Sequence, residues 1–255
     1  MCVPCSANKC RIQESDLRAA CLYIIFRMGI NRNTNKELDM KIAVIGATGY
    51  VGNAVVKELA ARGHKVTAFA RNIDKVFAAD NVTAVAADVT AADFADKLQG
   101  FDAVVSAFNP GWNNPNIGAD FATGAAAITE AAKAAAVPYL LVVGGAGSLY
   151  VAPGVQLIDT PEFPQEIFAG ANAARNLLTD LRPRRDVNWA FISPPAMFYE
   201  GSPFEPKGEY RFGQDDVLMS GDAPAGIHVD DLAKAIADDA EQKAHLFQRF
   251  TVAEV

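Results

Sequence analysis

Three glycines of this chain have a spacing that could bind a phosphate. Gly46, Gly49 and Gly52 form a G-x-x-G-x-x-G pattern directly after the apolar run 41–45. A buried strand that enters a helix through a glycine turn presents backbone N–H groups and the positive end of the helix dipole at one point. A helix-forming run, residues 50–61, follows here, as this motif requires. The pattern therefore predicts a pyrophosphate site and dinucleotide binding.

Each glycine has its own expected role at this site. Gly46 permits the tight turn, Gly49 lets the backbone approach the phosphates, and Gly52 lets the helix lie close on the sheet. The cofactor is also expected to contact the neighbours of these glycines, which are Thr48, Tyr50 and Val51. A loop without a ligand is the alternative interpretation.

A cation at the end of the next predicted strand, residues 65–71, bears on the choice of coenzyme. An acidic residue about 20 residues past the glycines holds the ribose of NAD, whereas an arginine nearby accommodates the 2′-phosphate of NADP. This position carries Arg71 and Asn72, and no carboxylate comes before Asp74. A guanidinium matches a phosphate bidentately. We therefore predict NADP(H) in preference to NAD(H); the alternative is a solvated arginine.

Further residues expected to contact the cofactor follow the later strands. Strand 82–87 leads to Asp88, which could bind the adenine, could serve as a helix cap or turn residue before a helix at 91–98, or could do both. Glycines at a strand end indicate close backbone approach, and those after strand 139–143 are expected beside the nicotinamide ribose. The complete set of these later cofactor contacts is Asp88, Val89, Ala107, Phe108, Val143, Gly144, Gly145 and Pro194.

Aromatic residues near the ends of strands 102–107 and 188–192 are candidates for binding a planar substrate. In an open parallel sheet, ligands bind beyond the carboxyl ends of the strands, where the turn-rich loop 108–116 is expected. Its Phe108 and Trp112 could stack on a planar substrate or could pack the loop down. Segment 193–199 leaves the sheet at two prolines, and its Phe198 and Tyr199 are the other substrate candidates.

The order of the predicted elements indicates the fold. Strands and helices alternate, with further helices expected at 118–136, 166–181 and 229–240 and a last edge strand at 249–252. This alternation predicts an α/β fold, a Rossmann-type doubly wound parallel sheet. Residues 194–228 are expected to add a small C-terminal substrate lobe, with Tyr210 and Phe212 in a short strand.

Composition limits the partners. The chain has 255 residues, 51% of them hydrophobic, and a net charge of −7. Neutralising phosphates requires a basic face, so we expect neither a nucleic-acid nor a membrane partner. No apolar run approaches the roughly 20 residues of a membrane span. A cytoplasmic monomer or homodimer is expected.

Residues 1–39 are expected to be a disordered leader or a start-site artefact, because Met40 stands directly before the first predicted strand. All four cysteines lie in the first 21 residues, and Cys2 and Cys5 have C-x-x-C spacing without a convincing fourth metal ligand. We therefore expect no metal site. Residues 40–255 are expected to form a single NAD(P)-binding domain.

The order of motifs resembles that of the atypical short-chain dehydrogenase/reductase superfamily, which includes NmrA-like proteins, and most closely that of bacterial NADH–flavin reductases. The stretches that carry the resemblance are Gly46–Gly49, 62–67, 142–149, 159–164, 193–196 and 248–252. Together they run from Met40 almost to the C-terminus. The resemblance implies a nicotinamide-binding Rossmann fold and reductase activity.

The acid of typical short-chain reductases is missing. Those enzymes use a tyrosine and a lysine at Y-x-x-x-K, but Tyr150 is followed four residues on by Gly154, and neither Tyr199 nor Tyr210 has a lysine there. Reduction of a flavin or quinone needs mainly alignment and exclusion of water. A flavin is therefore a possible substrate, and NADP(H) the expected hydride donor.

Two residues are candidates for catalysis. Ser148 could donate a hydrogen bond to the nicotinamide or to the acceptor, or it could be a turn serine that satisfies its own backbone. His228 could be a proton donor, or a helix N-terminal residue with a satisfied ring. The neighbouring Asp230 and Asp231 are expected to stabilise that helix start rather than to bind a metal.

Two functions are consistent with these residues. One is an NAD(P)H-dependent reductase of a small planar acceptor, favoured by the aromatic residues at the predicted site. The other is an NmrA-like regulator that binds NADP and senses redox state without turnover. A sugar epimerase or dehydratase is a weaker third interpretation, because those enzymes normally keep the tyrosine and lysine.

Overall fold

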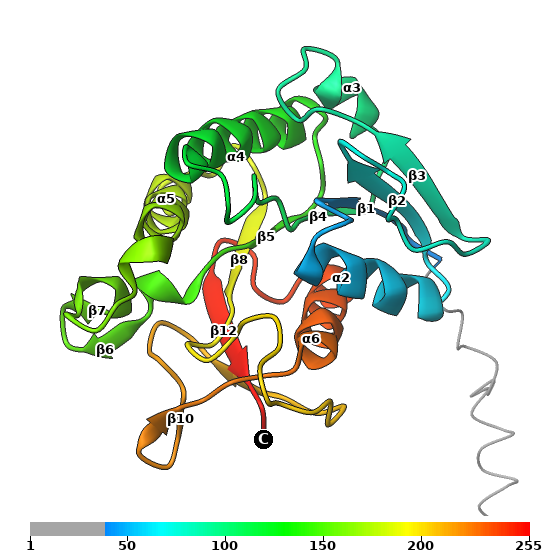
Figure 1. Ribbon diagram of the computed structural model, residues 1–255. Coiled ribbons are helices and arrows are strands. Elements are labelled where there is room, and N and C mark those ends of the chain that lie inside the picture. Colours follow the sequence, from blue (N-terminus) through cyan, green and yellow to red (C-terminus); the bar gives the residue numbers. More distant parts are fainter. Residues whose placement is uncertain (1–38) are drawn as a thin grey trace, which may run out of the picture. The chain divides into compact units, whose positions relative to one another are not determined.

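The computed structural model describes residues 39–255. Their main sheet has the strand order β3-β2-β1-β4-β5-β8-β12-β9 (Figure 1). The strands are β1 Lys41–Ile45, β2 Lys65–Ala70, β3 Val82–Ala86, β4 Ala103–Ser106, β5 Leu140–Val143, β8 Trp189–Ser193, β9 Arg211–Gly213 and β12 Arg249–Ala253. Each neighbouring pair is parallel except β12 and β9.

Helices cover both faces of this sheet. They are α2 Tyr50–Ala61, α3 Phe94–Lys97, α4 Ile117–Ala134, α5 Gln165–Leu181 and α6 Val229–Gln242. Helices α2 and α6 lie on one face, and α4 and α5 lie on the other (Figure 1). Strands β4 and β8 are buried along their whole length; their continuous apolar character is what a parallel strand covered on both faces requires. The predicted Rossmann-type doubly wound fold is confirmed.

The strand order reverses at β1, which pairs with β2 on one side and β4 on the other. The carboxyl ends of these parallel strands lie at one edge of the sheet. Ligands of open α/β sheets bind at such a switch point. The glycine turn that follows β1 therefore stands where a ligand is expected.

Three local predictions were wrong. Strand β12 is not an edge strand, because β9 pairs with it antiparallel, with Val252 opposite Phe212. Tyr210 precedes β9 rather than lying in it. The helix expected at 91–98 shrinks to α3, because hydrogen-bonded turns occupy the residues before it: the Ala91 N–H donates to the Asp88 carbonyl at 3.1 Å.

Short elements that the periodicity did not predict complete the part of the chain that the structure describes. Two of them are hairpins, β6 Tyr150–Ala152 with β7 Val155–Gln156 and β10 Met219–Ser220 with β11 Ala223–Pro224. The others are the 3₁₀ helices η1 Ala146–Ser148 and η2 Leu157–Asp159. No helix within residues 39–255 is long and apolar enough to cross a membrane.

Asp231 attaches the segment after β8 to helix α6. Its carboxylate is buried and accepts hydrogen bonds from the backbone N–H groups of Lys207 and Gly208, both at 2.8 Å. Asp231 therefore does more than stabilise the start of its own helix: it fixes part of the segment 194–228. The binding of substrate by that segment stays a prediction.

We expect Asp231→Ala to lower the free energy of unfolding by about 1–3 kcal/mol, because two backbone donors lose their acceptor. Urea unfolding measures this change. Asp230→Ala is the matched control, because the Asp230 side chain is 62% exposed; it should change the free energy by less than about 0.5 kcal/mol. Equal effects of the two variants would contradict this role of Asp231.

Candidate functional site

The turn after β1 has a geometry that only glycine provides. Gly46 has a φ of +78°, and a Cβ there would overlap the carbonyl oxygen of Ala107. The N–H groups of Gly46 and Ala47 both donate to the carbonyl of Phe69 on β2, at 3.0 and 3.2 Å. The turn is therefore held between the ends of β2 and β4.

Gly49 begins helix α2 without a side-chain cap. It is the N-cap residue, with φ −76° and ψ 170°, and no side chain accepts a hydrogen bond from the amides of the first turn. The first N–H groups of a helix have no intrahelical acceptor. Gly49 is exposed, and a Cβ there would meet the Gly46 carbonyl oxygen alone, at 3.3 Å. This helix end is thus open to an anion from solvent.

Gly52 serves packing within the protein. A Cβ at this buried position would overlap the Gly46 carbonyl group. The first turn of α2 can therefore lie directly on the glycine turn. Thr48, Tyr50 and Val51 lie beside these glycines and are half-buried. The N–H groups of Gly46, Ala47 and Gly49 donate within the protein, so the amides left for a ligand are those of the first turn of α2.

Arg71 and Asp88 follow the neighbouring strands β2 and β3, and both are exposed. Within residues 39–255, Arg71 forms no ion pair, so its guanidinium is available. Hydrogen bonds from the Thr90 backbone and hydroxyl, at 2.9 and 2.7 Å, hold the pKa of Asp88 below its ordinary value, and the charge of Arg71 adds to this. Asp88 thus serves as a turn residue, and its contact with the adenine stays a prediction. The Asn72 side chain accepts from the Asp74 N–H at 2.9 Å.

The aromatic residues of the loop after β4 separate into one packed and one exposed. Phe108 packs down against α4, where a Cβ at Gly124 would overlap its ring, and its centroid lies 6.1 Å from that of Phe121. Trp112 is 58% exposed and lies near Gly170 of α5. Phe108 therefore follows the packing alternative, and only Trp112 presents its ring to solvent.

The segment after β8 brings an aromatic ring to the glycine turn. The Phe198 ring stacks on that of Tyr50, the first residue of α2, with centroids 5.7 Å apart. The Tyr199 side chain is 50% exposed. Burial raises the pKa of Tyr50, and Glu200 and Asp230 add to this shift. Phe198 therefore stands beside the open end of α2, and its contact with a substrate stays a prediction.

The residues after β5 and β8 also lie at this edge. A Cβ at Gly144 would overlap the Phe191 ring. The glycine at position 144 is therefore required by the close approach of a ring of the protein itself. A Cβ at Gly145 would meet only the Ala174 Cβ, at 3.9 Å.

The other predicted cofactor contacts at the strand ends differ in exposure. Val143 is half-buried, Pro194 is buried, and Val89 packs against the core under α4 and α5. Ala107 donates its N–H to the Ile45 carbonyl at 2.9 Å, which joins the ends of β1 and β4.

Comparison with known proteins identifies the family. A family model of NAD(P)H-binding proteins matches residues 46–243, from the first glycine of the turn to the end of α6. The chain belongs to this NAD(P)H-binding family. Membership of this family supports a nicotinamide coenzyme as the ligand of the chain. Its contact with the glycine turn and the open end of α2 stays a prediction.

Several relatives share most of the chain. The uncharacterized protein YwnB of Bacillus subtilis (strain 168) is 39% identical over 217 residues, which are 84% of this chain and 98% of YwnB. A proposed NADH-flavin reductase from Streptococcus pneumoniae TIGR4 is 33% identical, with a TM-score of 0.75, covering 85% of this chain and 100% of that one. A proposed epimerase from Bacteroides thetaiotaomicron is 35% identical, with a TM-score of 0.76, covering 85% and 97%. The resemblance to atypical short-chain dehydrogenases/reductases is confirmed.

The two candidate catalytic residues have different surroundings in this NAD(P)H-binding fold. His228 is the N-cap of α6, and its Nδ1 accepts from the Asp230 N–H at 3.2 Å. This is the helix-terminal alternative for His228. Ser148 is buried in η1, and its hydroxyl oxygen lies 3.5 Å from Nη1 of Arg249. The catalytic roles of both residues stay predictions.

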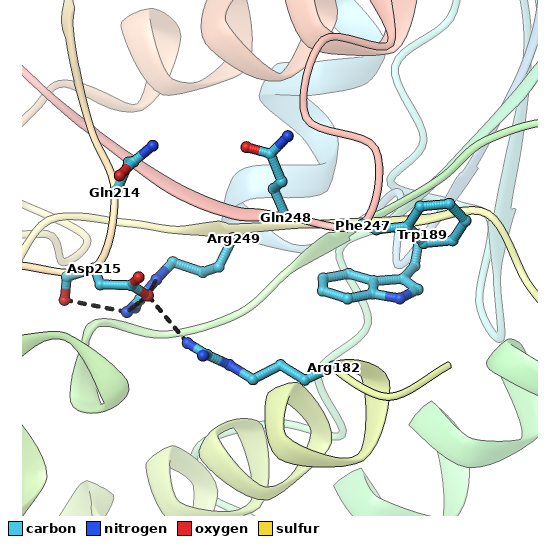
Figure 2. Close-up of a pocket in the computed structure, with 7 residues that line it drawn as sticks. All are labelled: Arg182, Trp189, Gln214, Asp215, Phe247, Gln248 and Arg249. Carbon is cyan, nitrogen blue, oxygen red and sulfur yellow. Dashed lines mark hydrogen bonds and ion pairs between the residues drawn. The ribbon is translucent and has the colours of Figure 1, made fainter. Parts of the chain in front are cut away.

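Sequence reasoning missed Arg249. Its guanidinium is buried and ion-pairs with Asp215, which also accepts from Arg182 at 3.0 Å (Figure 2). The sequence could have indicated it, because Arg249 is a charged residue at the start of the apolar strand 249–253, and a buried charge requires a partner. These residues line a cavity of about 220 Å³, together with Trp189, Gln214, Phe247 and Gln248.

The glycine turn lines neither the cavity beside Arg249 nor a second hollow on the described surface. The second, about 620 Å³, lies at the amino ends of β1 and β2 and is lined by residues that include Lys41, Lys65 and Phe101. The predicted phosphate site lies at an exposed helix end, because Gly49 is exposed and α2 has no side-chain cap. Within residues 39–255 no group of three or more His, Cys, Asp or Glu side chains could hold a metal. The cysteines lie outside the described residues.

Proposed function

We propose that this chain is an NAD(P)H-dependent oxidoreductase that passes a hydride to a planar acceptor such as a flavin or a quinone. The observation that carries the proposal is the uncapped end of α2 above a glycine turn, at the switch point between β1 and β4. Family membership supports nicotinamide binding. The name of the pneumococcal relative supports a flavin as acceptor.

Different residues of the chain would bind different parts of the cofactor. The amides after Gly49 would hold the pyrophosphate, because they lack both an intrahelical acceptor and a side-chain cap. Arg71, exposed at the end of β2, would bind a 2′-phosphate, so NADP(H) is preferred over NAD(H). The ends of β4, β5 and β8 would line the nicotinamide half.

Proton donation by a tyrosine is not needed for this reaction. Bound NAD(P)H would supply a hydride, and an acceptor ring nitrogen can take its proton from water. Burial raises the pKa of Tyr50, and burial with nearby carboxylates raises those of Tyr139 and Tyr210, which makes these three side chains weaker acids. On this proposal the residues at the site would mainly align the coenzyme and the acceptor. Trp112, Phe198 and Tyr199 are the proposed contacts to the acceptor.

The test is NADPH consumption by the purified chain with FMN or menadione as acceptor, followed by the loss of NADPH absorbance. We expect turnover above the buffer rate, and none with Gly49→Val as the control that lacks the phosphate site. Tight NADPH binding without turnover with either acceptor would contradict the reductase. That result would favour an NmrA-like NADP-binding regulator that senses redox state.

Other properties rest on expectation. We propose that the protein works in the cytoplasm, as a monomer or homodimer. We also propose that it has no nucleic-acid or membrane partner, because a net charge of −7 disfavours binding to polyanions. An epimerase activity, which the name of one relative suggests, is disfavoured because the sequence lacks the tyrosine–lysine pair.

A further inference from the structure

Arg249 uses every donor of its guanidinium inside the protein. Its side chain is 2% exposed. Nε donates to the Asp215 carboxylate at 2.9 Å, and Nη2 donates to the same carboxylate and to the Asp215 carbonyl oxygen. Nη1 contacts two hydroxyl oxygens, that of Ser148 at 3.5 Å and that of Ser193 at 3.4 Å. The guanidinium therefore joins β12, η1, the end of β8 and the segment after β9.

This arrangement determines what the two serines can do. A guanidinium has donors and no acceptor, so the oxygens of Ser148 and Ser193 accept from it. Their hydroxyl hydrogens must point elsewhere. Both serines are buried, and neither hydroxyl donates to an acceptor among residues 39–255. Buried donors without an acceptor are rare in native proteins, so these hydrogens are available to a ligand.

A third hydroxyl lies in the same buried layer. Thr251 is paired in register with Ser193, two residues along β12 from Arg249, and its Oγ1 has no hydrogen-bond partner in the described part of the chain. Residues in register on neighbouring strands face the same side of the sheet. Hydrogen-bonding capacity is thus left unused on the face that bears Ser193 and Arg249.

The serines stand at the functional edge of the sheet. Ser148 ends η1, which begins three residues after β5, and Ser193 is the last residue of β8, directly before Pro194. The carboxyl ends of these strands are where the nicotinamide and the acceptor are expected. Arg249, on the neighbouring strand β12, therefore contacts two hydroxyl groups at the edge of the sheet where the site is proposed.

We propose that Arg249 is a positioning residue that holds the Ser148 hydroxyl as a hydrogen-bond donor to a polar ring atom of the planar acceptor. This inference rests on the proposed reductase function. Asp215 orients the guanidinium and is itself held by the Tyr150 N–H, which donates to the Asp215 carbonyl at 2.8 Å. Burial lowers the pKa of Arg249, and the Asp215 carboxylate opposes this shift. A buried charge of this kind is stable only while it is paired.

A double-mutant cycle tests this role. Ser148→Ala and Arg249→Lys should each lower kcat/KM for FMN about tenfold, the effect of one lost hydrogen bond. The affinity for NADPH should change by less than about twofold in both. If Arg249 acts through Ser148, adding Arg249→Lys to Ser148→Ala should cause no further loss. A merely structural arginine would give losses that multiply.

Arg182→Met is the matched control, because Arg182 also pairs with Asp215 but is half-exposed and does not contact the serines. It should keep the wild-type kcat/KM, and an equal loss in this variant would overturn the proposal. If Arg249→Lys does not fold, Asp215→Asn replaces it in the cycle, with a smaller loss that should also vanish beside Ser148→Ala.

The same proteins separate this inference from the reductase function. The dissociation constant of FMN, measured by flavin fluorescence, needs no turnover. A wild type that binds FMN without turning over contradicts the reductase, and the cycle is then read on FMN affinity. Turnover that is unchanged in Arg249→Lys overturns the positioning role and leaves the reductase standing. A wild type that does not bind FMN contradicts both.

Discussion

Replacing Gly49 with valine is expected to weaken NADPH binding at least about a hundredfold, the loss of two hydrogen bonds to a charged group. The fold should tolerate the change, because the backbone of Gly49 is extended and a Cβ there meets only the Gly46 carbonyl oxygen, at 3.3 Å. The valine methyl groups would instead stand where a phosphate approaches the amides of α2. Calorimetric titration with NADPH measures the effect.

A graded series separates phosphate access from folding. Gly49→Ala should weaken binding less than valine does. Gly52→Ala should lower stability and binding together, because its Cβ overlaps the Gly46 carbonyl group. Thermal unfolding should show Gly49→Val close to wild type, apart from about 1 kcal/mol for the changed helix cap. A Gly49→Val protein that still binds NADPH tightly would mean that the phosphates lie elsewhere.

Removing the Arg71 side chain is expected to weaken NADPH much more than NADH. A charge-assisted hydrogen bond to a phosphate contributes about 1.5–3 kcal/mol, so Arg71→Ala should raise the dissociation constant of NADPH about 10- to 100-fold. NADH has no 2′-phosphate, and its affinity should change by less than about twofold. Because Arg71 is exposed and has no ion pair within residues 39–255, the stability should not change.

Lys75→Ala controls for the general loss of a positive charge, since Lys75 is also exposed and follows β2 by a few residues. It should weaken both coenzymes slightly and equally. The selectivity of the wild type should fall as ionic strength rises, because exposed charges are screened. Equal weakening of NADPH and NADH by Arg71→Ala would remove the assignment of Arg71 to the 2′-phosphate.

The sequence by itself determined the elements whose signals are local. The apolar run of β1, the three glycines and the helical run of α2 lie within about 20 consecutive residues, and α2 spans residues 50–61 as predicted. The alternation of strands and helices was sufficient for the Rossmann-type topology, because parallel strands with right-handed crossovers allow few arrangements. The position of Arg71 directly after β2 could also be predicted, because it follows from the distance along the chain between Arg71 and the glycines.

Tertiary structure decided the contacts between segments that are distant in the sequence. Phe108 turned inward because Gly124 on α4 leaves room for its ring, and Gly144 is required by the Phe191 ring of the neighbouring strand. No periodicity encodes such pairs. Strand β12 became internal only because β9, from the segment after β8, pairs with it.

The cluster around Arg249 is the clearest case. Its partners Asp215 and Ser148 lie 34 and 101 residues away along the chain. A charged residue in an apolar strand indicates that a partner must exist, because burying an unpaired charge costs too much free energy. Which residue that partner is depends on how the sheet, η1 and the segment after β9 pack together, and packing of this kind is a property of the folded chain.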